Sequence, residues 1–387
     1  MTRTDAYVFV DALGWDLVSR TGFLADLLPF RRDVEMQFGY SCSAVPAILS
    51  GTRPAENGHL SLFRYAPDAS PFRGLAALRH VLRPASFWRR GRVRHWLSKA
   101  VKRALGFTGY FQLYSVPLDR IACLDYCEKS DLFAAHGLAP AENPFDAWTR
   151  QGVRFHISDW RLGDDENLAA GVEAVRAGVE KAFVYTASLD AIRHDHAADM
   201  DADAIRRRLA GYEKAIRELH AALAGTGRPF SLTVFSDHGM TPLTKTIDVK
   251  SAVEATGLRF GVDYGCCYDS TLFRATWLRP GAKAAVEKAL EPFAADGHWL
   301  TEAEERAAGI WREDRAFGDA IFLVNPGVQI SPSDMGQKPL GGMHGYDPAD
   351  AHSRAAIMST DPIPDYVRHV ADYFKLMTSN HERRNEQ

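Results

Sequence analysis

Three aspartates stand at the ends of three short apolar runs of the sequence. The aspartates are Asp11, Asp190 and Asp237, and the runs that precede them are residues 6–10, 182–186 and 231–235. In an open α/β sheet, ligands bind beyond the carboxyl ends of the strands, so carboxylates at three strand ends converge on one crevice. Without compensation they repel one another. A cluster of this kind either holds protons at shifted pKa values or binds cations.

Three histidines accompany the aspartates. One lies four residues after the second aspartate, one directly follows the third, and one lies in a late glycine-rich segment; they are His194, His238 and His344. Carboxylate oxygens mixed with imidazole nitrogens suit two transition-metal ions of the zinc or manganese type. Magnesium and calcium prefer shells made of oxygen alone. Each residue by itself is more often a helix cap or an ordinary polar group, so the prediction depends on their joint occurrence.

A segment of small residues, 41–54, supplies candidate nucleophiles. It runs into a short predicted helix, and a hydroxyl at the start of that helix lies beside exposed backbone N–H groups. Such a hydroxyl could attack an anion that the amides and metals hold. Ser41 and Ser43 are the candidates, with Cys42 between them. By itself, the segment is also typical of a helix that begins with a capping serine.

The elements that must position these residues follow a repeated pattern. The apolar runs are rich in β-branched and aromatic residues, which is typical of buried parallel strands, and 355–358 is a fourth run of this kind. Between the second and third runs, apolar residues recur at three- and four-residue steps from Ile205 to Leu223, and Gly225 closes this helix. Strand, helix and strand at this spacing predict an α/β fold, a doubly wound and mostly parallel sheet with helices on both faces.

Composition and charge exclude several classes of protein. The chain has 387 residues, 46% of them hydrophobic, and a formal net charge of −3, which argues against binding polyanions over the whole surface. No apolar run approaches the roughly 20 residues of a membrane span. The first residues do not resemble a signal peptide, and five cysteines without a secretory context predict reduced thiols. We therefore expect one catalytic domain, 1–387, in the cytoplasm.

A basic block interrupts the α/β pattern. Residues 69–118 contain ten lysines and arginines and no acidic residue, so we expect 66–118 to be an inserted lid or cap. Within it, 91–105 carries Val93, Trp96 and further apolar residues at helical spacing opposite basic ones. This pattern predicts an amphipathic helix that either packs on the core or contacts the inner face of a membrane or a lipid-linked substrate. Nucleic acid is not an expected partner.

A second departure lies between 257 and 336. There the order changes to a strand-like run at 268–274, an alanine-rich helix, and another apolar run at 320–324. We expect this part to form a small α+β subdomain inserted before the last strand of the sheet.

Taken together, these residues resemble the alkaline phosphatase superfamily, and within it the nucleotide pyrophosphatase/phosphodiesterase branch. In that family a metal-binding aspartate closes the first strand, as Asp11 does here. The nucleophile stands nine residues before a Ser-Gly or Thr-Gly pair, and counting back from Ser50 gives Ser41. Three later motifs match as well: Asp190 with His194, Asp237-His238-Gly239-Met240, and His344-Gly345-Tyr346.

The resemblance implies a metal-dependent hydrolase of phosphate esters, small molecules or lipid-linked ones, with a phosphoseryl intermediate. It implies two divalent ions, zinc first and manganese second. One ion would be held by Asp11, Asp237, His238 and the Ser41 oxygen, and the other by Asp190, His194 and His344. Sulfatases of the superfamily use a cysteine at the nucleophile position, and Cys42 lies one residue too late. Ser43 lacks the family spacing.

Two departures from the family pattern leave the substrate open. Family phosphodiesterases place a phosphate-binding asparagine downstream of the nucleophile, where this chain has residues 61–64. Arg64 is therefore a candidate for binding the second charge of a monoester. A histidine-glycine pair of the family is replaced by Asn57-Gly58. A phosphotransferase or mutase, or a catalytically silent module that binds a membrane or an anion, remains an alternative, and the pattern predicts no oligomeric state.

Overall fold

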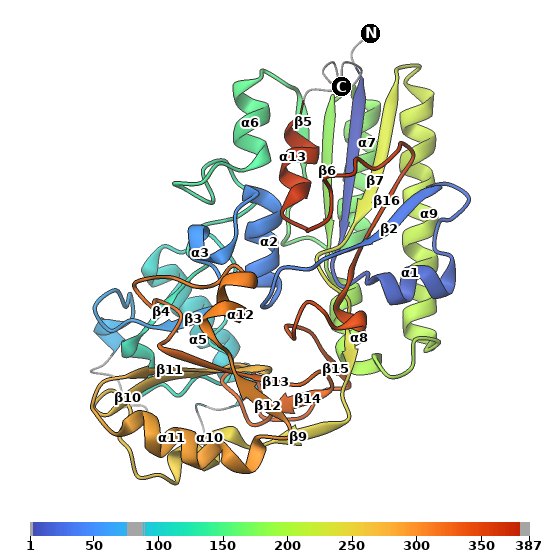
Figure 1. The fold of residues 1–387 in the computed structure, drawn as a ribbon. Helices are drawn as coiled ribbons and strands as arrows, with labels where there is room; N and C mark the ends of the chain where they lie inside the picture. The colour runs from blue at the N-terminus through green and yellow to red at the C-terminus, as the bar shows by residue number, and fades with distance from the viewer. Residues whose placement is uncertain (1–2, 76–87, 89, 380–387) are drawn as a thin grey trace.

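The computed structural model describes residues 3–75, 88 and 90–379, and its largest element is a six-stranded sheet (Figure 1). Its strands lie in the order β2-β16-β7-β1-β6-β5. They are β1 (Thr4–Val10), β2 (Phe30–Val34), β5 (Phe155–Ile157), β6 (Lys181–Thr186), β7 (Phe230–Phe235) and β16 (Ala355–Ser359). Because β5, β6, β1 and β7 run parallel, the predicted α/β fold with a mostly parallel sheet is confirmed.

The direction of the fourth predicted strand was wrong. Residues 355–358 do form a strand, β16, but it runs antiparallel to β7 on one side and to β2 on the other. Its residues are all buried, and this burial is what the apolar run reflects. An apolar run reports burial on both faces and carries no information on strand direction, and a mostly parallel sheet readily takes an antiparallel strand at its side.

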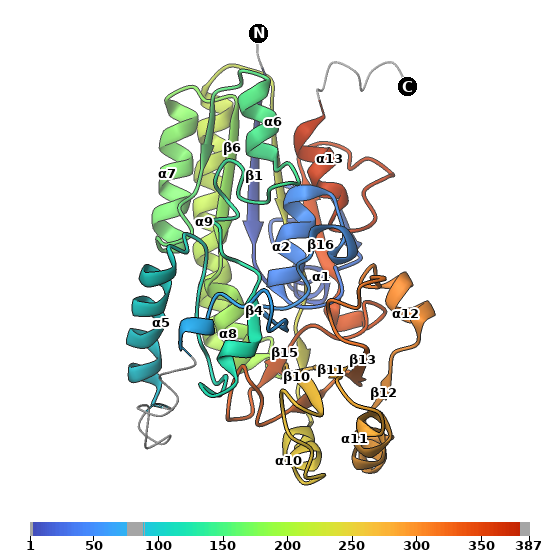
Figure 2. The same ribbon diagram turned by 90° about the vertical axis from the view of Figure 1, so that its left-hand side faces the viewer.

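Helices cover both faces of the sheet (Figures 1 and 2). Side chains alternate along each strand, so Val8 of β1 joins the core on one face while Tyr7 and Phe9 join the core on the other. The first face is covered by α7 (Asp164–Arg176) and α9 (Asp203–Gly225), and the second by α2 (Ser41–Ser50), α6 (Pro144–Arg150) and α13 (Asp372–Thr378).

A second, antiparallel sheet faces the edge at which the parallel strands end (Figure 1). It contains β10 (Tyr264–Tyr268), β11 (Leu272–Trp277), β13 (Ala320–Val324) and β12 (Gly297–Trp299), and α10 (Val249–Glu254), α11 (Ala282–Leu290) and α12 (Glu302–Ala307) accompany it. All four strands fall within 257–336, whereas α10, which contacts α11, begins earlier. The division into a domain, an insertion and a subdomain stays a prediction.

In its described residues, the basic block forms one long helix, α5 (Gly91–Leu105). Its buried side matches the predicted one only in part: Val101 is buried and Leu97 and Leu105 pack against the core, as the spacing predicts. Arg94 and Ser98 are buried as well, however, and Trp96 is 68% exposed. Arg94 is buried because its guanidinium donates to the backbone oxygens of Trp88 and Val116, each at 2.7 Å. Residues 76–87 and 89 of the predicted insertion lie outside the described residues.

Within the described ranges, no helix combines the length and the apolar character that a membrane crossing requires. The five cysteines carry free thiols. The short elements are α1 (Trp15–Thr21), α3 (Pro54–Asn57), α8 (Ser188–His196), β3 (Phe63–Tyr65), β4 (Leu124–Tyr126), β8 (Thr241–Pro242), β9 (Lys245–Ile247), β14 (Val328–Ile330), β15 (Gly342–Met343), and 3₁₀ turns at Ile121–Cys123, Glu291–Phe293 and Ala351–Ser353.

Candidate active site

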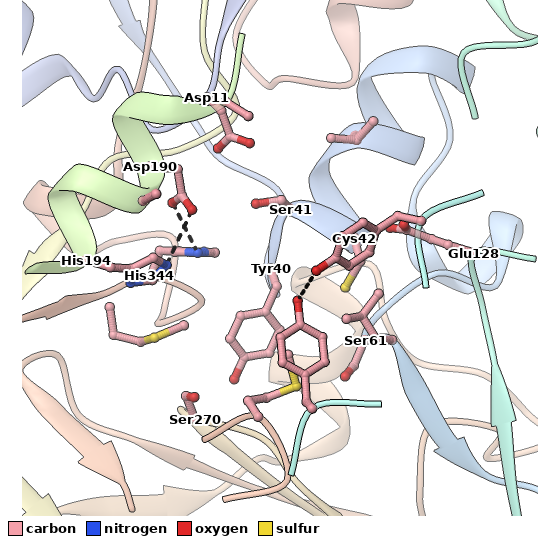
Figure 3. Close-up of a pocket in the computed structure, with 18 of the residues that line it drawn as sticks. Asp11, Tyr40, Ser41, Cys42, Ser61, Glu128, Asp190, His194, Ser270 and His344 are labelled. Atoms are coloured by element: carbon pink, nitrogen blue, oxygen red, sulfur yellow. Dashed lines mark hydrogen bonds and ion pairs between the residues drawn. The ribbon is translucent and has the colours of Figure 1, made fainter. Parts of the chain in front are cut away.

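The predicted ligands and the predicted nucleophile meet where the parallel strands face the second sheet. Figure 3 labels five of these residues: Asp11, Ser41, Asp190, His194 and His344. Each comes from a short connection or a helix start beyond a strand: Asp11 after β1, Ser41 at the start of α2, Asp190 and His194 on α8 after β6, Asp237 and His238 after β7, and His344 after β15. Asp190 and His194 stand one helical turn apart, so their side chains point the same way.

The first group is centred on His238. Its Nε2 lies 3.1 Å from Ser41 Oγ, 3.2 Å from Asp237 Oδ2 and 3.6 Å from Asp11 Oδ1. Its Nδ1 lies 2.8 Å from the backbone oxygen of Gly239. A carbonyl oxygen only accepts, so the proton is assigned to Nδ1 and the Nε2 lone pair faces the carboxylates.

The second group is Asp190, His194 and His344, whose ligand atoms all lie within 4.8 Å of one another. His194 Nε2 is 3.5 Å from Asp190 Oδ2, and His344 Nε2 is 3.7 Å from Asp190 Oδ1. The other ring nitrogen of His194 donates to the Gly342 oxygen at 2.9 Å, which fixes the orientation of this ring.

Asp190 lies between the two groups. Ligand atoms of Asp11, Asp190 and His238 also fit within 4.8 Å of one another. The rings of His238 and His344 are stacked with their centroids 3.7 Å apart. Asp237, which the resemblance places with Asp11 and His238, makes its contact with this group through Oδ2. The two predicted ligand sets are therefore neighbours in one cluster.

The electrostatics of the cluster fit bound cations. Burial, followed by the charges of Asp237 and Asp190, raises the pKa of Asp11 well above its ordinary value, and burial raises the pKa of Asp237. Burial and the neighbouring imidazoles lower the pKa of His344 well below its ordinary value. Four buried atoms of the ligand side chains have no hydrogen-bond partner among the described residues: Asp11 Oδ1, Asp190 Oδ1, Asp237 Oδ2 and His344 Nδ1. Unpaired carboxylates beside neutral imidazoles are the donor set of a divalent metal site.

Hydrogen bonds from outside the cluster hold the aspartates in place. Tyr185 donates its hydroxyl to Asp11 Oδ2 at 3.0 Å. Asp237 Oδ1 accepts the backbone N–H groups of Ala12 and His238, at 3.1 and 3.0 Å. These bonds occupy one oxygen of each carboxylate and leave the other turned toward the cluster, which is how supporting contacts orient metal ligands.

Ser41 and Ser43 occupy different environments. Ser41 lines the pocket next to the cluster, whereas Ser43 is fully buried and donates its hydroxyl to the backbone oxygen of Phe38 at 2.8 Å. Successive residues of a helix point about 100° apart, so residues 41 and 43 cannot both face the cluster. The structure thus places Ser41, and not Ser43, beside the predicted metal ligands.

The pocket that contains Ser41 has a volume of about 540 Å³. Asp11, Asp190, His194 and His344 lie on one side of it (Figure 3). The remaining wall is mainly apolar and aromatic, and its side chains include Leu62, Tyr110, Tyr114, Phe133, Trp160, Met335 and Leu340. Sequence reasoning missed this wall because its members come from separate loops and share no spacing.

Arg64 is not among the residues brought together here. It lies on β3, opposite Asp125 of β4, and its guanidinium donates to Asp125 Oδ2 at 2.9 and 3.2 Å. Of the residues 61–64, Ser61 and Leu62 line the pocket. The hydroxyl of Ser61 donates to Asp269 Oδ1 at 2.7 Å, so its proton is already engaged.

Comparison with known proteins places the chain in a family. The profile of type I phosphodiesterase / nucleotide pyrophosphatase matches residues 7–347. Among solved structures, murine ectonucleotide pyrophosphatase/phosphodiesterase 5 is similar at 14% identity and a TM-score of 0.65, with 97% of this chain and 94% of that chain covered. An inactive form of the murine protein in complex with AMP gives the same values.

The human counterpart is similar at 13% identity, with the same TM-score of 0.65 and the same coverage, 97% of this chain and 94% of that one. No curated protein matches the chain. These structural similarities establish the alkaline-phosphatase-like fold, and the profile covers nearly the whole chain, including every ligand position described above. The chain therefore belongs to the type I phosphodiesterase / nucleotide pyrophosphatase family of metal-dependent phosphoric ester hydrolases.

Proposed function

We propose that the protein hydrolyses phosphate diesters with Ser41 as the nucleophile and two divalent metal ions, preferably zinc, as cofactors. The observation that carries this proposal is the position of Ser41 Oγ, 3.1 Å from His238 Nε2 and beside unpaired carboxylate oxygens. Asp11, Asp237, His238 and Ser41 would hold one ion, and Asp190, His194 and His344 the other. Bound divalent ions neutralise the phosphate and lower the pKa of the serine hydroxyl.

The chain's own residues account for the steps. Ser41 Oγ gives its proton to solvent, attacks phosphorus and forms an ester bond, while the bond from phosphorus to the leaving oxygen breaks and that oxygen takes a proton from solvent. A water molecule then attacks the phosphoserine, which releases the phosphate product and restores the Ser41 hydroxyl. The hydrogen bonds to Asp11 and Asp237 hold these two carboxylates in the same position during both steps.

Ser41→Ala tests the nucleophile, with Ser43→Ala as the matched control. We expect Ser41→Ala to lower kcat for bis(p-nitrophenyl) phosphate by at least roughly a thousandfold, because the covalent step is lost. Ser43→Ala removes only a buried hydrogen bond and keeps activity within a few fold. Elemental analysis of Ser41→Ala should still find two metals per chain. Full activity of Ser41→Ala, or an inactive but folded Ser43→Ala, contradicts the assignment.

The polar groups of the pocket support a preference for diesters. Among its described lining residues, Lys338 is the single lysine or arginine, and its side chain is exposed. Arg64 is engaged with Asp125, so its guanidinium is not available for the second charge of a monoester. We expect kcat/KM for bis(p-nitrophenyl) phosphate to exceed that for p-nitrophenyl phosphate. The opposite order, lost in Lys338→Gln, would identify a monoesterase.

A phosphotransferase of the same superfamily remains the second candidate. It would pass the phosphoryl group from Ser41 to an alcohol in place of water. Product analysis in the presence of an alcohol acceptor separates the two, because a hydrolase releases the phosphate product and a transferase yields a new ester. The membership in a family of phosphoric ester hydrolases favours the hydrolase.

A further inference from the structure

The pocket continues past the reacting groups to a carboxyl group that the hydrolysis steps leave unused. Glu128 lines the pocket and is only 8% exposed. In Figure 3 it lies on the side of Ser41 opposite Asp190 and His344. Within the part of the chain that the structure describes, its carboxyl oxygens have no hydrogen-bond donor and no ion-pair partner. A buried carboxyl without a partner is costly, so its presence in a pocket calls for an explanation.

Among the described residues, the groups that interact electrostatically with Glu128 are tyrosines and cysteine thiols, which supply no positive charge. Burial raises the pKa values of Tyr110, Tyr114 and Tyr126, and the negative field of Glu128 adds to each shift. The field of Glu128 also reaches the thiol of Cys42, the neighbour of Ser41 in sequence. Lys129, next in sequence to Glu128, forms an ion pair with Asp125 instead.

Aromatic rings complete this end of the pocket. The hydroxyls of Tyr110 and Tyr114 pair at 2.7 Å, and their ring centroids lie 6.5 Å apart. Trp160 also lines the pocket, but cations already lie over its ring, with Arg161 at 4.5 Å and Lys102 at 5.2 Å from its centroid. The rings of Tyr110 and Tyr114 line the pocket, and their hydroxyls feel the charge of Glu128, so they offer aromatic surface at this end of the pocket. Aromatic faces attract cations, as does a carboxylate in an apolar pocket.

We propose that Glu128, with Tyr110 and Tyr114, binds a substituted ammonium group on the substrate. The substrate would then be a zwitterionic diester, with its phosphate at Ser41 and its cation at the far end of the same pocket. This assignment rests on the proposed function and adds the substrate class to it. An ammonium group supplies the charge that the buried carboxyl lacks, whereas a neutral apolar group would leave Glu128 unpaired.

Two diesters that share one leaving group test the assignment. Trimethylammonioethyl p-nitrophenyl phosphate carries the cation, and neohexyl p-nitrophenyl phosphate replaces its nitrogen by carbon at nearly the same shape. We expect the native protein to favour the cationic ester in kcat/KM. Glu128→Gln should reduce this preference by about tenfold or more, because it removes the buried charge and keeps the size of the side chain. Glu173→Gln, on the exposed side of α7, should leave the preference unchanged.

A binding measurement keeps the assignment testable without turnover. Neohexyltrimethylammonium should inhibit the native protein competitively and bind it in calorimetry, and neohexanol should bind far more weakly. Equal kcat/KM for the two esters in the native protein overturns the assignment of Glu128 and leaves the proposed hydrolysis intact. If neither ester nor bis(p-nitrophenyl) phosphate is cleaved, the proposed function fails, and selective binding of the ammonium compound then decides on Glu128 alone. A folded Glu128→Gln protein that keeps the native preference also overturns it.

Discussion

At the scale of single residues, the cluster concentrates like charge. Asp11 and Asp237 are buried, Asp190 lies within reach of both ligand groups, and each carries a buried oxygen that no described residue hydrogen-bonds. Such an arrangement destabilises the folded protein unless a cation or a proton compensates it. The carboxylates that would bind metal therefore lower the stability of the metal-free protein.

Asp237→Asn separates these two contributions. The asparagine keeps an oxygen for the N–H groups of Ala12 and His238 but removes one negative charge. With a chelator present, we expect the variant to be more stable than the native protein by about 1–3 kcal/mol in denaturant unfolding. With metal supplied, elemental analysis should find one ion per chain in place of two. The exposed Asp199→Asn serves as the control, and a chelated Asp237→Asn protein less stable than the chelated native one contradicts the account.

The same residues show what a sequence reveals. The family motifs name each ligand, and strand ends explain why the ligands meet. Glu128 and the tyrosines near it were not predicted, because they reach the pocket from loops with no recurring spacing. Arg64 was predicted to bind substrate, but its partner Asp125 comes from a strand pairing that the local sequence does not indicate.

At the scale of elements, α5 shows how a helix pattern can give the right bounds and only part of the buried face. Gly91–Leu105 is helical as the spacing predicts, yet its buried side includes Arg94 and Ser98. Ser98 accepts the backbone N–H of Leu113, and Arg94 reaches backbone oxygens. These hydrogen bonds to loop backbone explain why Arg94 and Ser98 face inward while Trp96 faces solvent. Leaving buried backbone groups unpaired would cost more free energy than exposing one tryptophan.

The exposed side of α5 keeps the membrane hypothesis open to test. Trp96 stands there with Lys99 and Arg103, and each basic residue near an anionic surface contributes about 1 kcal/mol. We expect salt-sensitive co-sedimentation with anionic vesicles, lost in Lys99→Glu plus Arg103→Glu. Arg206→Glu plus Arg207→Glu, on the exposed side of α9, is the matched control. Absence of lipid-dependent pelleting would leave α5 as a packed lid helix.

At the scale of the whole molecule, one tyrosine joins the two sheets at the active site. Tyr40, directly before Ser41, accepts the backbone N–H of Thr271 at 2.8 Å and pairs with its hydroxyl at 2.7 Å. Thr271 precedes β11 of the second sheet, and its hydroxyl donates to the oxygen of Gly345, directly after His344. The nucleophile and a metal ligand are thereby tied to the same point on the second sheet.

Tyr40→Phe removes the hydroxyl that makes both contacts with Thr271. A buried N–H is left without its partner, so we expect a loss of about 1–3 kcal/mol in unfolding free energy. We expect kcat to fall by about tenfold, since small displacements of a nucleophile weaken catalysis. Tyr373→Phe removes a longer hydroxyl contact at 3.5 Å outside the pocket and is the control. Native kcat in Tyr40→Phe would show that the two sheets hold Ser41 without this contact.

The order of the ligands along the chain has a consequence for folding. Asp11 lies near the beginning of the chain and His344 near its end, with the other ligands spread between them. Bringing them together requires closure of very long loops, an entropic cost that is met only when both sheets have formed. Metal ions that bind the native state more strongly than the unfolded chain would stabilise the native state by mass action. Bound ions would thus stabilise the protein only after both sheets have formed, and we expect its resistance to proteolysis to rise with the free metal concentration.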